Sequence, residues 1–563
     1  MRTRSLLRVA FIAAILAVPL GSVQGAGQGS TGGTSAEYVV TYAPAARAEA
    51  LAAIKAAGGT VTGTVKALGV ARVDTTNSQF QAAVTASGVV RGLVRNHSVG
   101  TVKPGMAHRF VTERPLASQA GPAPAGVPTT RGPRHGVEPL SSLQWDMAMI
   151  GATPTGAWKT TTGRGVQVGI IDTGVDASHP DLAPNFSSTL SRNFTIDIPS
   201  IDGPCEYATC IDPANVDNGG HGSHVAGSVA AARNGVGIAG VAPDATIVNV
   251  RAGQDSGYFF LYETVAALAY AGDAGLDVVN MSFFTDPWLY NCESAADYIS
   301  GAPPTADQIA EQALIRQLVQ AATAYANSKG VTLVAAAGNS HFNLALPVRP
   351  DAISPDYPAN AAQPRVVTDN CLVLPGEAAN VIQVSAVGPS TTKADYSNYG
   401  VGSIDVAAPG GWFRDLIGTP QFRTNPNQVL SSYPLDLAIE EGLANPNGTP
   451  TNDLSRADCS VSPCAFYTYL QGTSMASPHT TGVAALIIEA HGSGTPSKGY
   501  SMAPATVRLI LRATATDHAC PAGGVEIYTD EGRAAEFNAV CDGTTAYNGL
   551  YGDGIVNAAA AVK

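Results

Sequence analysis

The sequence is poor in charged side chains and has no apolar segment long enough to cross a membrane. Lys, Arg, Asp and Glu make up only 13% of the 563 residues, whereas hydrophobic residues make up 45%. This composition excludes an overall disordered chain, because it supplies enough apolar material for a large buried core. The apolar run from Val9 to Leu20 falls short of the roughly 20 residues that a membrane-spanning helix needs. We therefore expect no membrane contact.

That run is typical of a secretory signal, which we predict over residues 1–26. Arg2, Arg4 and Arg8 precede it, and small residues gather after it as a signal peptidase requires. The sequence thus predicts a secreted protein.

Cysteine is absent before residue 200, and no CxxC motif or Cys/His pairing occurs, which argues against a structural zinc site. An exported compartment permits disulfides, but eight cysteines allow 105 connectivities. Closeness in sequence favours the pairs 205–210, 459–464 and 520–541, which leaves 292–371.

Charge is distributed unevenly along the chain. Residues 1–139 carry a net charge of +9 and residues 140–563 one of −21, within a total of −12. An acidic main domain argues against nucleic-acid binding, which needs a basic face. A basic front and an acidic back could attract one another, although solubility alone could also explain the acidity.

Three regions follow the signal. Residues 37–103 contain strand-like and helix-like runs and predict a small α/β unit. Residues 104–139 are rich in Pro, Gly, Ala and Arg without periodicity, as in an exposed linker that is open to proteolysis. Residues 140–563 form the main domain, with no accessory domain expected after it.

Strand-like and helix-like runs alternate in the main domain, which predicts an α/β fold with a parallel sheet covered by helices on both faces. The predicted strands are 166–171, 246–250, 277–281, 331–336 and 381–387, and the predicted helices are 221–232, 259–274, 307–328, 474–490 and 504–513. In such sheets active sites lie outside the carboxyl ends of the strands.

Three polar motifs occur where this rule places chemistry. A strand ends in Asp172-Thr-Gly, a helix opens with His221-Gly-Ser-His-Val-Ala-Gly, and Gly-Thr-Ser474-Met-Ala-Ser-Pro-His leads into another helix. Alone, each has an ordinary explanation: a turn, a surface histidine or a helix cap. Together they supply the carboxylate, imidazole and hydroxyl that acyl transfer to a serine needs.

These motifs, in the order Asp, His, Ser, resemble those of the subtilisin-like serine peptidases. The resemblance implies a three-layer fold in which Ser474 is the nucleophile, His221 the general base and acid, and Asp172 its orienting partner. It also implies that the amide of Asn339, in Ala-Ala-Ala-Gly-Asn, joins the Ser474 N–H in an oxyanion hole.

Two other kinds of site are compatible with parts of these motifs. Asp172-Thr-Gly and Asp255-Ser-Gly could be the carboxylates of an aspartic peptidase, but Asp255 follows no buried apolar strand and Ser474 would be left unexplained. His221 and His224 could share a metal, but no HExxH pattern follows.

Family members bind an extended peptide between two exposed strand edges. The resemblance places one edge at Asp255-Ser256-Gly257 and the other at Ser282 to Phe284, with Gly338 bordering the primary specificity pocket. Phe283-Phe284 departs from the Leu-Gly that the family usually has, which predicts altered non-primed subsites.

The resemblance also implies a structural calcium ion, since mixed oxygen ligands suit Ca²⁺. The implied ligands are the side chains of Gln144, Asp181 and Asn234 and the carbonyls of Ala232, Val236 and Ile238.

Residues 37–103 resemble the family's inhibitory propeptide, whose cleavage would fall between about 100 and 140; a permanent accessory domain is the alternative. Three apparent insertions, near 284–305, 341–375 and 412–468, have no counterpart and no assigned role.

The leading hypothesis is a monomeric, secreted serine endopeptidase made as a zymogen, with protein or peptide substrates and its own propeptide as inhibitor. A non-catalytic binding protein of the same fold, or a peptide ligase or cyclase that uses the same acyl-enzyme, are the alternatives.

Overall fold

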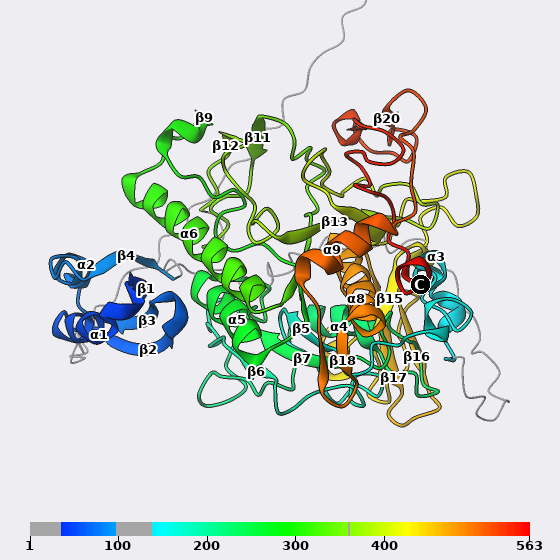
Figure 1. Ribbon diagram of the computed structural model, residues 1–563, viewed down its shortest axis with the longest axis horizontal. Coiled ribbons are helices and arrows are strands. Elements are labelled where there is room, and N and C mark those ends of the chain that lie inside the picture. The colour runs from blue at the N-terminus through cyan, green and yellow to red at the C-terminus, as the bar shows by residue number, and fades with distance from the viewer. Residues whose placement is uncertain (1–34, 97–137, 359–360) are drawn as a thin grey trace, which may run out of the picture.

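The computed structural model describes residues 35–96, 138–358 and 361–563. The predicted signal and nearly all of the predicted linker, with the expected cleavage region, lie outside these ranges. Within them, none of the helices is both long and apolar enough to cross a bilayer. The described residues form a small N-terminal unit beside a larger α/β unit (Figure 1).

The N-terminal unit is a four-stranded antiparallel sheet in the order β2-β3-β1-β4, with two helices. Its elements are β1 (Ala36–Tyr42), α1 (Arg47–Ala56), β2 (Thr60–Val65), β3 (Val70–Thr75), α2 (Phe80–Thr85) and β4 (Val90–Arg95). This order is that of a ferredoxin-like unit, as predicted. The helices pack Ile54 and Phe80 against Val73 in a core of their own.

The larger unit is built on a seven-stranded sheet whose neighbouring strands all run parallel, in the order β14-β13-β10-β8-β5-β7-β6. The strands are β5 (Gln167–Ile171), β6 (Arg192–Asn193), β7 (Thr246–Arg251), β8 (Val278–Met281), β10 (Thr332–Ala336), β13 (Val381–Val387) and β14 (Val406–Pro409). Their central residues are buried on both faces, which explains the near-continuous apolar runs. The predicted parallel sheet is confirmed.

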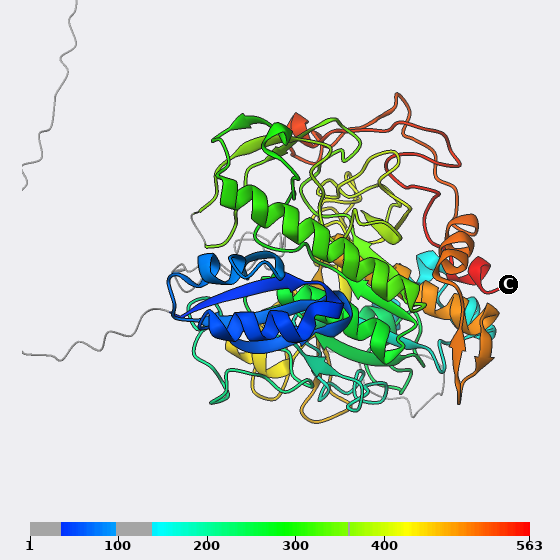
Figure 2. The same cartoon turned by 60° about the vertical axis from the view of Figure 1, so that its left-hand side comes forward.

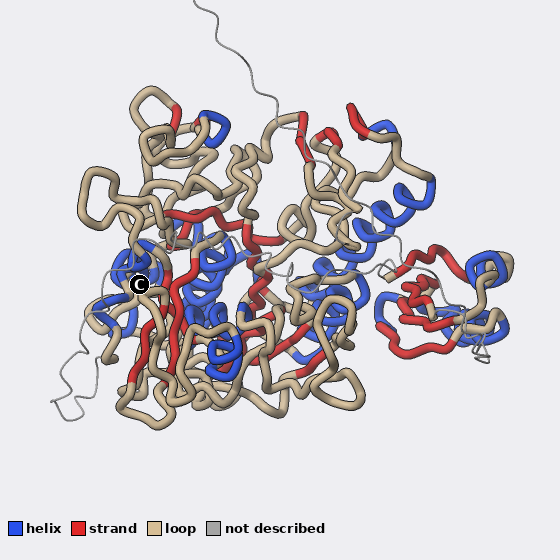
Figure 3. Tube along the Cα trace, turned by 180° about the vertical axis from the view of Figure 1, so that it is seen from behind, coloured by secondary structure: helices blue, strands red, loops and turns tan. Residues whose placement is uncertain are grey.

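Helices cover both faces of this sheet (Figure 3). On one face, α5 (Leu261–Ala274) and α6 (Ala306–Ser328) pack together over β8 and β10. On the other face lie α4 (His221–Ala230) and α8 (Thr473–His491), followed by α9 (Pro504–Ala513). The shorter helices are α3 (Trp145–Ile150), α7 (Leu435–Glu440) and α10 (Ala558–Ala561).

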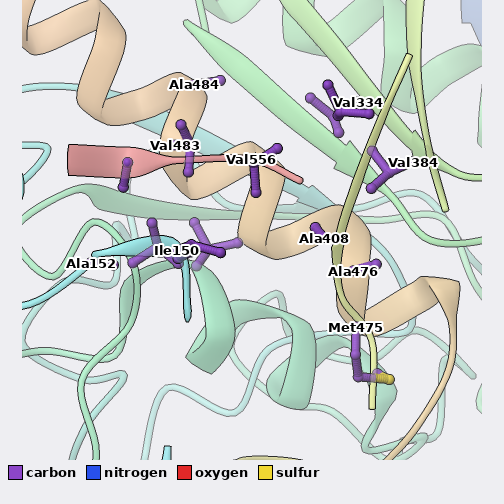
Figure 4. Packing of buried hydrophobic residues seen from close by; sticks show 14 of the residues in the cluster. Ile150, Ala152, Val334, Val384, Ala408, Met475, Ala476, Val483, Ala484 and Val556 are labelled. Carbon is purple, nitrogen blue, oxygen red and sulfur yellow. The ribbon is translucent and has the colours of Figure 1, made fainter. Parts of the chain in front are cut away.

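Helix α8 is almost entirely buried along its length. Its residues Met475, Ala476, Val483 and Ala484 belong to one apolar cluster with β10, β13 and β14 residues such as Val334 (Figure 4). The small side chains of α8 let it lie close to the sheet. The start of this helix is therefore held firmly by packing, and Ser474 lies there.

The insertions form small antiparallel sheets at the edge of the larger unit. One has the order β11-β12-β9 and the other β15-β17-β16. Their strands are β9 (Tyr298–Gly301), β11 (Val348–Asp351), β12 (Arg365–Thr368), β15 (Val429–Ser432), β16 (Ser455–Asp458) and β17 (Ala465–Leu470); the hairpins β18 (Ser493–Thr495) with β19 (Gly499–Ser501) and β20 (Val525–Glu526) with β21 (Ala539–Val540) lie nearer the C-terminus.

Four disulfides join the cysteines: 205–210, 459–464 and 520–541, which sequence proximity favours, and 292–371, the pair that remains. Cys292–Cys371 connects two of the insertions, so these segments fold as one peripheral module.

The N-terminal unit rests on α5 and α6 (Figure 2). Arg72 donates to Glu263 of α5 over 3.1 Å, and both side chains are nearly buried. Asn96 donates to the other oxygen of Glu263 and accepts from the Tyr262 N–H at the start of α5. Since Glu37 also contacts Asn96, a buried polar cluster ties the two units together.

Candidate active site

The predicted site residues come from adjacent parts of the sheet edge. Asp172 follows β5, Ser282 follows β8 and Asn339 follows β10, at the carboxyl ends of three neighbouring strands. His221 is the first residue of α4, and Ser474 is the second residue of α8. The two helices pack against one another on the same face of the sheet.

Asp172 and His221 form a direct pair. His221 Nδ1 donates to Asp172 Oδ1 over 2.7 Å, and the two side chains are at most 1% exposed. The same oxygen accepts the Thr173 N–H over 2.8 Å, which fixes the carboxylate. Because the carboxylate binds the proton on Nδ1, the neutral ring carries its lone pair on Nε2.

A second carboxylate, Asp217, holds the start of α4 in place. Its Oδ1 accepts from the N–H groups of Gly219 and Gly220 and from the hydroxyl of Thr173, and its Oδ2 accepts from the Ser223 N–H. Thr173 Oγ1 in turn accepts the Gly222 N–H. Thr173 is thus connected to both neighbours of His221, directly to Gly222 and through Asp217 to Gly220. This role of Asp217 was not predicted from the sequence.

Ser474 rests on the end of β8. Its hydroxyl lies 3.3 Å from the Ser282 carbonyl oxygen, and the Ser282 hydroxyl donates to the Ser474 carbonyl over 3.0 Å. Asn280 donates to Ser282 Oγ and accepts from Ser477 and Thr481 in the first turns of α8. An Asn in the otherwise apolar strand Val-Val-Asn-Met was the available sequence signal for this support.

Asn339 is oriented by the residue before Ser474. Its Oδ1 accepts from the Thr473 N–H over 2.8 Å and from the Thr473 hydroxyl over 2.9 Å. Thr473 Oγ1 also accepts the Gly338 N–H. With the oxygen used in this way, the Nδ2 group is presented as a donor beside Ser474.

The two alternative sites do not form. Asp255 Oδ1 accepts from Arg251 Nη2 over 2.7 Å, while Asp172 pairs with His221, so these aspartates do not share a proton. His224 Nε2 donates to two backbone carbonyls, and burial lowers the pKa of His224 to about 3. Its neutral ring is therefore committed to structure and is not paired with His221 around a metal.

The predicted substrate edges lie near each other. The N–H groups of Ser256 and Gly257 donate to Asp202 and to the Gln254 carbonyl. The ring of Phe283, within the second edge, stacks on the ring of Phe259, two residues after Gly257, with centroids 4.0 Å apart. This stack brings the two segments into contact.

The predicted calcium ligands also come together. Asp181 Oδ2 accepts from the Ile238 N–H and from the Tyr467 hydroxyl, and Asn234 bonds the Pro180 carbonyl. Gln144 pairs through both side-chain atoms with the backbone of Ala239.

Asp181 Oδ1 is buried without a hydrogen-bond partner among the described residues. Burial raises the pKa of Asp181 to about 7. An unsatisfied buried carboxylate oxygen next to the carbonyl-bearing loop 232–238 fits a cation.

A second acidic group was not foreseen from the sequence. Oxygen atoms of Asp197, Glu206, Asp212 and Asp255 lie within 4.8 Å of one another, an arrangement that could hold a metal ion.

Comparison with known proteins agrees with the geometry of the site. The model of the family described as "Subtilase family" matches residues 163–541. M-protease from Shouchella clausii is 28% identical over 375 residues, which are 67% of this chain and 65% of that protein. Subtilisin Savinase from Lederbergia lenta is 27% identical over 422 residues, 75% of this chain and 99% of that one.

Among solved structures, the epidermin leader peptide processing serine protease from Staphylococcus aureus has a TM-score of 0.59 at 21% identity. The match covers 94% of this chain and 98% of that chain. It supports the same fold over both the N-terminal and the larger unit.

Proposed function

The chain belongs to the subtilase family, and we propose that it is a secreted serine endopeptidase made as a zymogen. The observation that carries this proposal is the buried 2.7 Å pair between Asp172 and His221, together with a serine at the start of helix α8, which packs against the helix that His221 begins. In this proposal His221 takes the proton of Ser474 as the hydroxyl attacks a peptide carbonyl. Asp172 keeps the ring in the tautomer that can do so and stabilises its charged form.

The negative oxygen that forms in this step would be bound by Asn339. Its Nδ2 donor is preset, since Oδ1 is held by Thr473. A donor that needs no reorientation during the reaction is the most effective kind. The Ser474 N–H is the second proposed donor. The protonated His221 then gives its proton to the amine nitrogen as the C–N bond breaks, and water, deprotonated by His221, hydrolyses the acyl-enzyme and restores the Ser474 hydroxyl.

The substrate would lie between the edge at Ser256 and Gly257 and the edge at Ser282 to Phe284, with Gly338 beside the first side chain. The N–H groups of Ser256 and Gly257 already donate within the protein. A peptide at this edge would therefore donate its own N–H groups to the backbone carbonyl oxygens of the edge. The stacked rings of Phe259 and Phe283 join the two edges and would occupy one end of the groove between them. We therefore expect small side chains to be preferred at the distal non-primed position.

Residues 37–103 would act as the inhibitory propeptide. The buried contact of Arg72 and Asn96 with Glu263 supports a tight association. Protein or peptide substrates, the propeptide as inhibitor, a monomeric state and secretion are parts of the same proposal.

A calcium ion would be held by Asp181, Gln144 and Asn234 with the carbonyls of Ala232, Val236 and Ile238. Its charge would satisfy the buried Asp181 Oδ1 and would stabilise the folded protein, because only the folded chain assembles these ligands.

The test compares the secreted chain with its Ser474→Ala variant. A serine-directed phosphonate should label the wild-type protein at Ser474, and N-terminal sequencing should show loss of residues 37–103. The variant should be secreted, unlabelled and unprocessed. Labelling at another residue, or a wild-type protein that is stable but neither labelled nor processed, would contradict the proposal.

A further inference from the structure

We propose that a pocket in the peripheral module binds a lysine or arginine side chain of the substrate, several residues before the bond that is cut. The pocket has a volume of about 400 Å³, and Trp288, Glu311 and Tyr357 are among the residues that line it. The three residues of the proposed triad do not line it. The inference rests on the proposed function, because the endopeptidase proposal supplies the peptide that would carry this side chain.

The carboxylate of Glu311 lacks a positively charged partner. Its Oε2 accepts the indole N–H of Trp288 over 2.8 Å, and its Oε1 accepts no hydrogen bond from the described residues. Burial raises the pKa of Glu311 to about 7, and the negative charge of Asp307 acts in the same direction. A carboxylate that has lost water without gaining a counter-ion is costly. A cation that enters the pocket would remove that cost.

The nearest guanidinium is already committed to other groups. Arg365 lies over the ring of Trp288, 4.8 Å from its centroid. It donates through Nε to Asp351 over 2.9 Å and through Nη1 to Gln312 over 2.8 Å. Within the described ranges, no lysine, arginine or histidine forms an ion pair with Glu311. The positive charge at Glu311 must therefore come from outside the chain.

The walls of the pocket suit a long basic side chain. They include the rings of Pro287, Trp288, Tyr357 and Pro358. Lysine and arginine carry their charge at the end of an apolar stem, which such walls can cover. Aromatic rings also attract cations. A neutral apolar side chain would leave Glu311 without a counter-ion, and an acidic side chain would be repelled by it.

The pocket borders both predicted substrate edges. Pro287 follows Phe284, the last residue of the second edge, by three residues. Tyr258 directly follows Gly257 of the first edge, and its ring contacts the ring of Tyr357 with centroids 5.3 Å apart. An extended peptide that continues past the stacked phenylalanines can therefore place a side chain in the pocket. Two insertions of previously unassigned role supply most of the lining.

The first test measures binding directly in the full chain with Ser474→Ala, which cannot cleave the probe. The probes are N-acetyl-lysine methylamide and its norleucine counterpart, which has the same stem without the ammonium group. By isothermal titration calorimetry, the lysine probe should bind at least about tenfold more tightly, as a charge-assisted contact predicts. Glu311→Gln should abolish this difference. Glutamine retains an oxygen for the Trp288 N–H, so the unfolding temperature should stay unchanged.

The second test measures steady-state cleavage by the wild-type enzyme. Peptides carry lysine or norleucine at one position, from about the fourth to the eighth residue before the scissile bond, because an extended chain advances about 3.3 Å per residue. At one or two adjacent positions, lysine should lower KM about tenfold with little change in kcat. The preference should vanish in Glu311→Gln. It should persist in the control Asp369→Asn, which removes an exposed carboxylate from the same module.

Equal binding of the two probes to the Ser474→Ala chain would overturn the proposal. It is also overturned if lysine gives no advantage at any position, or if Glu311→Gln keeps the preference. Failure of the endopeptidase proposal would be distinguishable, as absent phosphonate labelling of the wild-type protein. The binding measurement would still decide whether the pocket selects a basic side chain.

Discussion

Removal of the Asp217 carboxylate should damage catalysis through the position of His221. In Asp217→Ala the start of α4 loses its bond to the Ser223 N–H, a helix cap of about 1–2 kcal/mol. The Gly219 and Gly220 N–H groups and the Thr173 hydroxyl lose their acceptor as well. At about 1 kcal/mol for each bond, the total loss of unfolding free energy is about 4–5 kcal/mol.

The effect on activity should follow from geometry. Thr173 and the start of α4 position the two partners of the 2.7 Å contact between Asp172 and His221. A displacement of about 1 Å at such a site typically lowers the rate about 100-fold. We expect kcat to fall by about that factor while KM changes little, because Asp217 touches neither predicted substrate edge.

The assay pairs urea unfolding with steady-state kinetics on a peptide substrate. Asp217→Asn should lower the free energy of unfolding by only about 1–2 kcal/mol. Its remaining side-chain oxygen can still accept from the three donors at Oδ1, and only the bond from the Ser223 N–H is lost. Asp176→Ala is the matched control, since the side chain of Asp176 bonds only within its own turn, to Ser178. An Asp217→Ala variant that unfolds at the wild-type urea concentration and keeps kcat within twofold would rule out this supporting role of Asp217.

Three further outcomes are expected. Asn339→Ala should lower kcat by about 10²–10³-fold, the loss known for this kind of donor in subtilisins, with KM little changed; an unaltered kcat would remove Asn339 from the oxyanion hole. Burial, reinforced by nearby Glu263, raises the pKa of Glu37 to about 8, so docking of the N-terminal unit takes up a proton. Docking should be tightest below the ordinary pKa of 4.5 and weaken as pH rises through about 8, as gel filtration after cleavage of the linker can measure. Glu37→Gln should flatten this dependence, and a pH-independent release of the wild-type unit would oppose it. Replacement of Cys292 and Cys371 by Ser should lower the free energy of unfolding by about 4.5 kcal/mol, because the disulfide closes a loop of 79 residues. Loss of the Cys205–Cys210 disulfide, which closes a loop of five residues, should lower it by only about 2 kcal/mol. Chemical denaturation that shows the reverse order would contradict this.

The central fold was predictable because its signals are local. Apolar runs located five of the seven strands, and two of these strands, β5 and β10, precede the motifs at Asp172 and Asn339. The strands β6 and β14 were missed, since β6 has only two residues and β14 ends in Pro409, which cannot donate a backbone hydrogen bond. Helix α5 begins at Leu261, two residues later than predicted, because Phe260 is its extended N-cap and Phe259 stacks on Phe283.

The supports of the site were not predictable in the same way. Asp217 and Asn280 carry no motif, and their importance follows from hydrogen bonds to segments as distant as Ser477. Ser282 was predicted as a substrate residue, yet its hydroxyl bonds the Ser474 backbone. The carboxylates around Arg251 are spread from 197 to 255. Only the path of the chain through space brings such residues together.

The four disulfides lie in the loops and insertions, outside the strands and helices that carry Asp172, His221 and Ser474. Disulfides therefore stabilise the peripheral loops and insertions, whereas the segments that carry the site residues depend on packing and hydrogen bonds. A reductant should therefore loosen the peripheral loops and insertions well before it disturbs the buried pair of Asp172 and His221.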